Sequence, residues 1–267
     1  MGLENKKLFL FDIDGTIAIG DTLYNGSREL LSYISSVGGK SYFITNNSTK
    51  SGTDYVKKFK NCFGLDATEN LFVTSGYMTL CFLKKHFSLQ KIYCLGTSSF
   101  IRELKNNGLT ITEEADDDIA CIIAGFDNEL TYRKLEIACE LLSTRDLPFY
   151  ATNPDLRCPV PFGFVPDCGA ICEMLRSSTG KTPVYLGKPN AAVVDFCLSD
   201  SGFSKEETLV VGDRLYTDIA CGINAGVDTC VLFTGEAKKE DLANTAFSPD
   251  YCFDTVTDLL HALRTGN

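Results

Sequence analysis

Two pairs of closely spaced aspartates could bind a divalent cation or act as nucleophile, acid or base. Asp12 and Asp14 are separated by one residue in the segment Asp-Ile-Asp-Gly-Thr. Asp213 and Asp218 belong to the segment Gly-Asp-Arg-Leu-Tyr-Thr-Asp. Neighbouring carboxylates repel one another, and a divalent cation relieves this repulsion, while a carboxylate can also attack an electrophile or transfer a proton. Taken singly, each pair is also explained by a helix cap and a turn.

A hydroxyl-bearing segment and one lysine extend this set. Thr45, Asn46 and Asn47 offer hydroxyl and amide groups, which alone are typical of a turn with a helix cap. Lys188 precedes Pro189, so it marks a helix start or serves as a fixed charge for an oxyanion. Together with the aspartates, these residues supply metal ligands, donors for phosphate oxygens and a compensating cation.

Each of these clusters follows a short apolar segment that indicates a buried strand. The predicted strands are 7–11, 41–44, 208–211 and 229–233, and the predicted helices are 27–37, 53–62, 191–198 and 218–225. Strands that alternate with helices are typical of a doubly wound, Rossmann-like α/β parallel sheet. Ligands bind beyond the carboxyl ends of the strands in such a sheet, which is where the clusters lie.

The middle of the chain predicts a second α/β unit inserted into this core. Strands are expected at 91–95, 120–124 and 149–152, and helices at 99–107 and 132–143. Residues 153–169 are rich in Pro and Gly and predict an irregular loop, which in a compact domain is often functional. We therefore predict a core of residues 1–77 and 183–267 with an inserted cap domain at residues 78–182.

Composition excludes several classes of partner. The 267 residues carry 25 Lys+Arg against 35 Asp+Glu, a net charge of −10. So acidic a chain repels nucleic acids and anionic membranes, although a bound cation would let it accept a small phosphorylated substrate.

Two further features of the sequence bear on where the protein resides. The N-terminal apolar run is too short for a signal peptide, and no later stretch suits a membrane span, so we expect a cytoplasmic protein. The 12 cysteines are scattered and there are only two histidines, which predicts reduced core cysteines and no zinc site.

The motifs resemble those of the haloacid dehalogenase (HAD) superfamily of phosphatases. The segments FDIDGTI, ITNNS, LGKPN and VVGDRLYTDIACGINAG look like the NagD / p-nitrophenylphosphatase group. The segment ATNPD at residues 151–155 resembles part of that group's cap domain. The resemblance extends from about residue 8 to residue 235 and implies a HAD core with an α/β cap.

The resemblance also implies a role for each core residue. Asp12 would be the nucleophile that forms an aspartyl-phosphate, and Asp14 would protonate the leaving group and then activate water. Thr45 and the amide of Asn46 would donate hydrogen bonds to the phosphoryl oxygens. Lys188 would offset the negative charge on Asp12 and on the phosphoryl group.

A magnesium site follows from the same resemblance. The carboxylates of Asp12 and Asp213 and the backbone carbonyl of Asp14 would hold Mg²⁺. Asp218 would lie at the edge of the site and bind the water ligands of the metal or Lys188.

The cap would exclude water and contact the leaving group. Asn153 and Asp155 are the candidate substrate contacts, with Arg157 a lesser one, although Asn153-Pro154-Asp155 is also consistent with a simple turn. The expected reaction is Mg²⁺-dependent hydrolysis of a small phosphorylated metabolite, such as a nucleotide or sugar phosphate. The relatives also suggest a homodimer formed through the cap.

Two other functions use similar groups. A receiver-like signalling module would be phosphorylated on Asp12 and change its partners, but such modules are about half this length and lack an inserted domain. A phosphomutase would transfer a phosphoryl group within a sugar, using a similar acid pair under a cap that excludes water. Asp14 separates the first alternative from a phosphatase, because without it a phosphoenzyme would accumulate.

Overall fold

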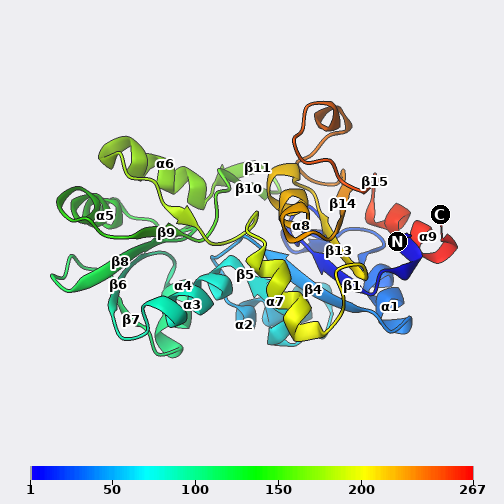
Figure 1. Ribbon diagram of the computed structural model, residues 1–267, viewed down its shortest axis with the longest axis horizontal. Coiled ribbons are helices and arrows are strands. Elements are labelled where there is room, and N and C mark those ends of the chain that lie inside the picture. Colours follow the sequence, from blue (N-terminus) through cyan, green and yellow to red (C-terminus); the bar gives the residue numbers. More distant parts are fainter. Residues whose placement is uncertain (1, 267) are drawn as a thin grey trace.

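A computed structural model describes residues 2–266 and contains two parallel sheets that lie at opposite ends of the molecule (Figure 1). The first sheet has the strand order β15-β14-β13-β1-β4-β5, and every neighbouring pair is parallel. Its strands are β1 (Leu8–Phe11), β4 (Lys40–Thr45), β5 (Phe72–Thr74), β13 (Thr208–Gly212), β14 (Asp228–Leu232) and β15 (Tyr251–Phe253).

Helices cover both faces of this sheet, as the continuous apolar character of β1 requires. Phe9 and Phe11 pack on one face with residues of α1 and α9, whereas Leu8 and Leu10 pack on the other face with α7 and α8. The helices of this part are α1 (Ser27–Ser36), α2 (Gly52–Lys58), α7 (Ala192–Ser201), α8 (Ala220–Ala225) and α9 (Val256–Thr265). The predicted doubly wound fold class is therefore confirmed.

The second sheet lies at the left of Figure 1 and has the order β12-β9-β8-β6-β7, again parallel throughout. Its strands are β6 (Lys91–Leu95), β7 (Thr110–Thr112), β8 (Ile119–Ala124), β9 (Phe149–Ala151) and β12 (Val184–Tyr185). Its helices are α3 (Ser75–His86), α4 (Ser98–Asn106), α5 (Tyr132–Thr144) and α6 (Cys168–Thr179). Residues of α5 and α6 pack on one face, and those of α3 and α4 on the other.

The order of the elements is that of a core interrupted by an inserted unit. Strand β5 pairs in the first sheet, and the next strand, β6, pairs in the second. Strand β12 pairs with β9 in the second sheet and begins two residues after the predicted cap end at residue 182. The domain limits of 1–77, 78–182 and 183–267 stay predictions.

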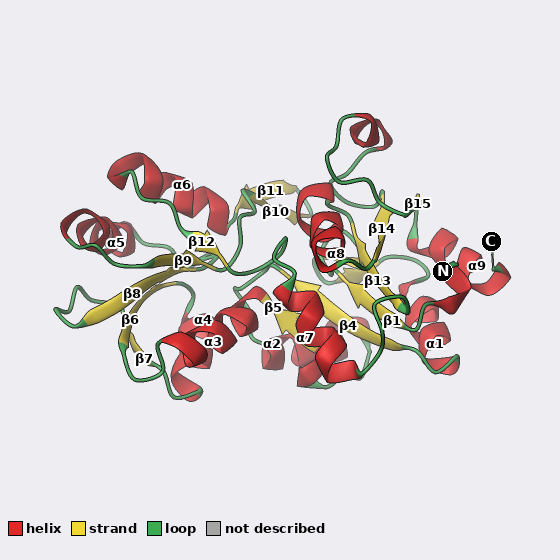
Figure 2. Ribbon diagram, viewed as in Figure 1, coloured by secondary structure: helices red, strands yellow, loops and turns green. Residues whose placement is uncertain are grey.

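The prediction of an irregular loop at residues 153–169 was wrong. This segment contains an antiparallel hairpin, β10 (Arg157–Val160) and β11 (Gly163–Pro166), and the first residues of α6 (Figure 2). A two-stranded ribbon tolerates Pro159 and Pro166 because only one edge of each strand needs backbone donors. Phe162 and Phe164 are exposed, so the hairpin lacks the alternation of buried and exposed residues that identifies a strand.

Several short elements complete the fold. A small hairpin of β2 (Ala18–Ile19) and β3 (Thr22–Leu23) follows the first aspartate pair. A π-helical turn, Phe59–Phe63, extends α2, and another, Leu215–Ile219, precedes α8. Among residues 2–266 no helix combines the length and apolar character of a membrane span, and every cysteine is free.

Candidate active site

The central strands of the first sheet bring the predicted site residues together. Strand β1 lies between β4 and β13, and its last residue, Phe11, pairs with Phe43 and Val211. The segments after these parallel strands leave the same edge of the sheet, so Asp12 and Asp213 become neighbours. Lys188 and Asp218 reach the same place from the segments that precede α7 and α8.

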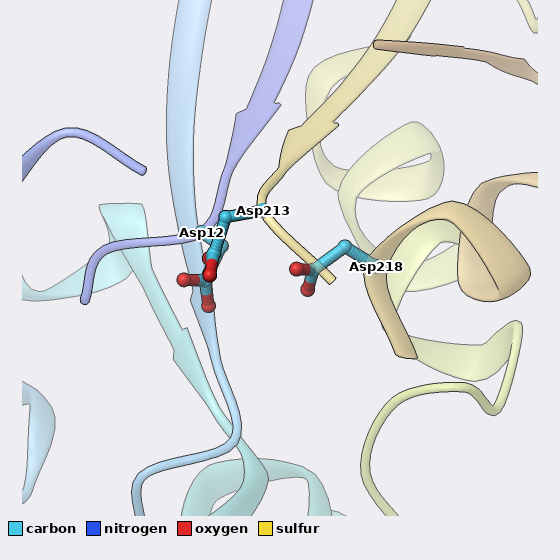
Figure 3. A group of neighbouring side chains, drawn as sticks. All are labelled: Asp12, Asp213 and Asp218. Carbon is cyan, nitrogen blue, oxygen red and sulfur yellow. The ribbon is translucent and has the colours of Figure 1, made fainter. Parts of the chain in front are cut away.

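Three buried carboxylates form the centre of the site. Oxygen atoms of Asp12, Asp213 and Asp218 lie within 4.8 Å of one another. Figure 3 shows Asp12 and Asp213 side by side after their strands, with the Asp218 carboxylate directed toward them from the opposite side. Mutual repulsion makes such a group unfavourable unless cations compensate it.

Lys188 is a buried cation that compensates part of this negative charge. Its Nζ atom donates to Asp12 Oδ1 and to Asp218 Oδ1, each at 2.6 Å, and to the carbonyl of Ile44 at 3.0 Å. Burial by itself would lower the pKa of Lys188, but the two carboxylates raise it, so the ammonium group stays charged. All three N–H donors of the Lys188 ammonium group therefore have acceptors within the protein.

Burial leaves the acids poorly compensated despite this lysine. It raises the pKa of Asp12 well above its usual range, against the opposing effect of Lys188. Burial, and then the charge of Asp218, raise the pKa of Asp213 to about 6. A further cation would favour the ionised carboxylates and reverse these shifts.

The surroundings of Asp213 keep its carboxylate in a defined place. Thr16 Oγ1 donates to its Oδ1 atom at 3.0 Å, and the backbone N–H of Glu236 donates to its Oδ2 atom at 2.8 Å. Two glycines make room for the carboxylate: a Cβ atom would lie 2.6 Å from Oδ2 at Gly15 and 2.0 Å at Gly235. The carboxylate oxygens of Asp12, Asp213 and Asp218 are the hard ligands that a cation such as Mg²⁺ prefers, and these contacts hold the Asp213 carboxylate in place beside the other two.

The segment after β4 is tied to the lysine-bearing segment. The Asn46 side chain accepts a hydrogen bond from the Lys188 backbone N–H at 2.9 Å and donates to the Lys188 carbonyl at 3.0 Å. The hydroxyl of Thr45 accepts from the Asn47 backbone N–H at 3.1 Å. These residues and Asp12 line a small cavity of about 30 Å³, which has room for only a few atoms.

Asp14 lines the same cavity but has a different environment from the triad. Its Oδ1 atom lies 3.6 Å from Nζ of Lys58, a residue at the end of α2. Lys58 was not among the predicted residues, because nothing in the pattern of α2 distinguishes it from its neighbour Lys57.

The cap residues predicted to contact substrate are buried in a polar network. Asn153 is fully buried and donates to Asp155 at 3.0 Å and to Asp167 at 2.9 Å. Asp155 lines the small cavity and accepts from Asn46 Nδ2 at 2.7 Å. Arg157 is more exposed and pairs with Glu236 at 3.0 Å. Substrate contact by Asn153 and by Asp155 stays a prediction.

Arg214 joins this network to the core, and it was not among the predicted residues. Its Nη1 atom lies 2.7 Å from Asp155 Oδ1, and its Nε atom lies 3.2 Å from Glu236 Oε2. Its position directly after Asp213 in the sequence was the available signal. An arginine with two acidic partners fixes the cap segment against the strand end that carries Asp213.

The two-part α/β fold and the buried acidic site suit an enzyme of phosphoryl chemistry. Comparisons with known proteins support this class. A haloacid dehalogenase-like hydrolase family model matches residues 9–110, and a HAD-hydrolase-like model matches residues 185–259. An acid sugar phosphatase of Staphylococcus aureus (strain MRSA252) is 33% identical over 263 residues, which are 98% of this chain and 100% of the relative. The chain belongs to the haloacid dehalogenase-like hydrolases.

Solved structures narrow this assignment. The 4-nitrophenylphosphatase from Thermotoga maritima is 38% identical with a TM-score of 0.90, and the match covers 98% of each chain. NagD from E. coli K-12 is 30% identical with a TM-score of 0.83, covering 95% of this chain and 98% of NagD. The protein is thus a hydrolase of the NagD / p-nitrophenylphosphatase-like group of HAD phosphatases.

Proposed function

We propose that the protein hydrolyses small phosphate monoesters in a Mg²⁺-dependent reaction through an aspartyl-phosphate on Asp12. The observation that carries the proposal is the position of the Asp12 carboxylate. It is bound to Lys188 Nζ at 2.6 Å, lies beside Asp213 and Asp218, and faces the small cavity. The names of the relatives, a sugar phosphatase and a 4-nitrophenylphosphatase, support small esters as substrates.

The reaction would proceed in two steps on the residues of this chain. An oxygen of Asp12 forms a bond to phosphorus while the bond from phosphorus to the ester oxygen breaks, and Asp14 gives its proton to the departing alcohol. Asp14 then removes a proton from water, whose oxygen attacks the phosphoryl group and releases Asp12 as a carboxylate. Lys188 and the Thr45 hydroxyl offset the charge on the transferring oxygens in both steps.

The metal site would use the carboxylates of Asp12 and Asp213 and the backbone carbonyl of Asp14. When bound, Mg²⁺ would neutralise the anions that must approach one another. Asp218 would have a supporting role: its Oδ1 atom holds Lys188, and its Oδ2 atom accepts from the Arg214 backbone N–H at 3.0 Å.

A panel of phosphate esters tests the proposal directly. We expect phosphate release from p-nitrophenyl phosphate, a hexose phosphate, a nucleoside monophosphate and a glycerol phosphate in Mg²⁺. EDTA should lower each rate at least about 100-fold. Conversion of a hexose 1-phosphate to the 6-phosphate without phosphate release would instead indicate a phosphomutase. Stable labelling of Asp12 by acetyl phosphate without turnover would indicate a signalling module.

Metal binding should also be visible as thermal stabilisation, independently of turnover. A ligand at about 100 times its Kd stabilises the native state by about 2.7 kcal/mol, which raises Tm by about 5 °C for a chain of this size. We expect this shift in the wild type and in the control Asp66→Asn, whose carboxylate is exposed, but not in Asp213→Asn. Differential scanning calorimetry with and without Mg²⁺ measures it. An equal shift in Asp213→Asn would remove this residue from the metal site.

A further inference from the structure

Asp155 follows strand β9 of the second sheet, yet its carboxylate contacts two strand ends of the first sheet. Its Oδ1 atom accepts from Arg214 Nη1 at 2.7 Å, and its Oδ2 atom accepts from Asn46 Nδ2 at 2.7 Å. Asn46 directly follows β4, Arg214 is the second residue after β13, and these two strands lie on either side of β1. One side chain from the inserted unit therefore bridges the core segments that flank Asp12.

The contact with Asn46 extends to Lys188. The Asn46 amide group bonds to the backbone N–H of Lys188 at 2.9 Å and to its carbonyl at 3.0 Å. Lys188 Nζ in turn donates to Asp12 Oδ1 at 2.6 Å. Because Asp155 orients the Asn46 amide, it also supports the position of the ammonium group beside Asp12.

The contact with Arg214 extends to the acidic group in the same way. The backbone N–H of Arg214 donates to Asp218 Oδ2 at 3.0 Å, and its Nε atom lies 3.2 Å from Glu236 Oε2. The backbone N–H of Glu236 donates to Asp213 Oδ2 at 2.8 Å. The planar guanidinium group has its donors in a fixed arrangement, so the bond to Asp155 helps to orient both of these segments.

The charge of Asp155 does not by itself favour a phosphate ligand. The residue is 1% exposed and lines the small cavity, where a carboxylate would repel phosphoryl oxygens. Burial of a carboxylate is costly unless donors compensate it, and Arg214, Asn46 and Asn153 supply those donors. What Asp155 can contribute to a phosphate site is therefore the position of its hydrogen-bond partners.

We propose that Asp155 is a positioning residue for the phosphatase reaction, which holds the segments after β4 and β13 in the places that phosphoryl transfer needs. This inference rests on the proposed function. The role is independent of the leaving group, unlike the substrate contact predicted from the sequence. A displacement of catalytic groups by about 1 Å is enough to lower a rate about 100-fold.

Asp155→Asn tests this role, because it keeps the volume of the side chain but turns an N–H donor toward Arg214 or Asn46. We expect kcat/KM to fall about 100-fold, by the same factor within about threefold, for p-nitrophenyl phosphate, a hexose phosphate and a glycerol phosphate in Mg²⁺. Inorganic phosphate has no leaving group, and we expect it to bind at least about tenfold more weakly in calorimetry with Mg²⁺. Loss of negative charge alone would instead tighten phosphate binding.

Asp228→Asn is the matched control. Asp228 pairs with the buried Lys6 at 2.7 Å, and it begins β14, so it lies at the opposite edge of the first sheet from Asp12. This variant also removes one partner of an ion pair, but it should keep the wild-type kcat/KM and the wild-type phosphate affinity. Partial unfolding reduces the amount of active protein without changing the Kd of the folded fraction, so phosphate affinity distinguishes displacement of the site from loss of fold.

Unchanged or tighter phosphate binding in folded Asp155→Asn overturns the inference, whatever the rates. A fall in kcat/KM that differs by more than about tenfold among the esters also overturns it, because it indicates contact with the leaving group. If Asp155→Asn does not fold, Arg214→Lys breaks the same contact from the core side, since lysine keeps the charge but lacks the planar fork. The same two results are expected of that variant, and wild-type values would overturn the inference. Absence of phosphate release from every ester in the wild type would instead refute the proposed function.

Discussion

Asp12→Asn is expected to lower kcat by about four orders of magnitude or more, because an amide oxygen is too weak a nucleophile to form the phosphoenzyme. The substitution changes the volume of the side chain very little. It also removes a carboxylate whose pKa is raised by burial, so the fold should not be weakened by loss of charge. Phosphate release from p-nitrophenyl phosphate in Mg²⁺ measures the loss, and circular dichroism checks the fold.

Asp66→Asn provides the matched control for this experiment. It is the same chemical change at an exposed position outside the site, and we expect wild-type kcat. Mass spectrometry of the Asp12→Asn protein must exclude deamidation back to aspartate. If a clean preparation still turns over at more than about one hundredth of the wild-type rate, Asp12 is not the nucleophile.

The sequence predicted those elements of the fold whose local pattern matches their final environment. Strand β1 and strand β6 are continuous apolar runs buried in parallel sheets, and both were predicted within a residue of their limits. Helix α9 was not predicted, although Leu259 and Leu263 form a buried stripe at helical spacing. The hairpin of β10 and β11 was missed for a physical reason: its aromatic residues point to solvent, so no burial pattern marks it.

The candidate site was predictable where chemistry is concentrated in short segments. Asp12, Thr45 and Asp213 lie at the carboxyl ends of apolar strands, and parallel pairing brings these positions to one edge of the first sheet. Lys188 also follows an apolar run, but that run is β12 of the second sheet, so this rule does not explain its position. The contacts that connect them were not predictable in this way. Asn46 and Asp155 are 109 residues apart in the chain, and no local pattern indicates that their side chains bond to each other.

Asp14→Asn should lower kcat by about 10²- to 10⁴-fold on alkyl phosphates, the range expected for loss of a general acid and base. An alkoxide leaves poorly without a proton, whereas p-nitrophenolate leaves well, so the first step should be slowed much less with p-nitrophenyl phosphate. The second step still lacks its base with either substrate. The variant should therefore release p-nitrophenol in a rapid burst and then turn over slowly as the phosphoenzyme accumulates.

Rapid-quench kinetics with both kinds of substrate separates these effects. In the wild type no burst is expected, because Asp14 serves both steps. A burst with p-nitrophenyl phosphate and none with an alkyl phosphate would match the two roles, since the alkyl ester is held at the first step. Activity close to wild type on both substrates would remove Asp14 from acid and base catalysis. Equal slowing without a burst would contradict its role in the second step, because hydrolysis of the phosphoenzyme would then remain fast relative to its formation.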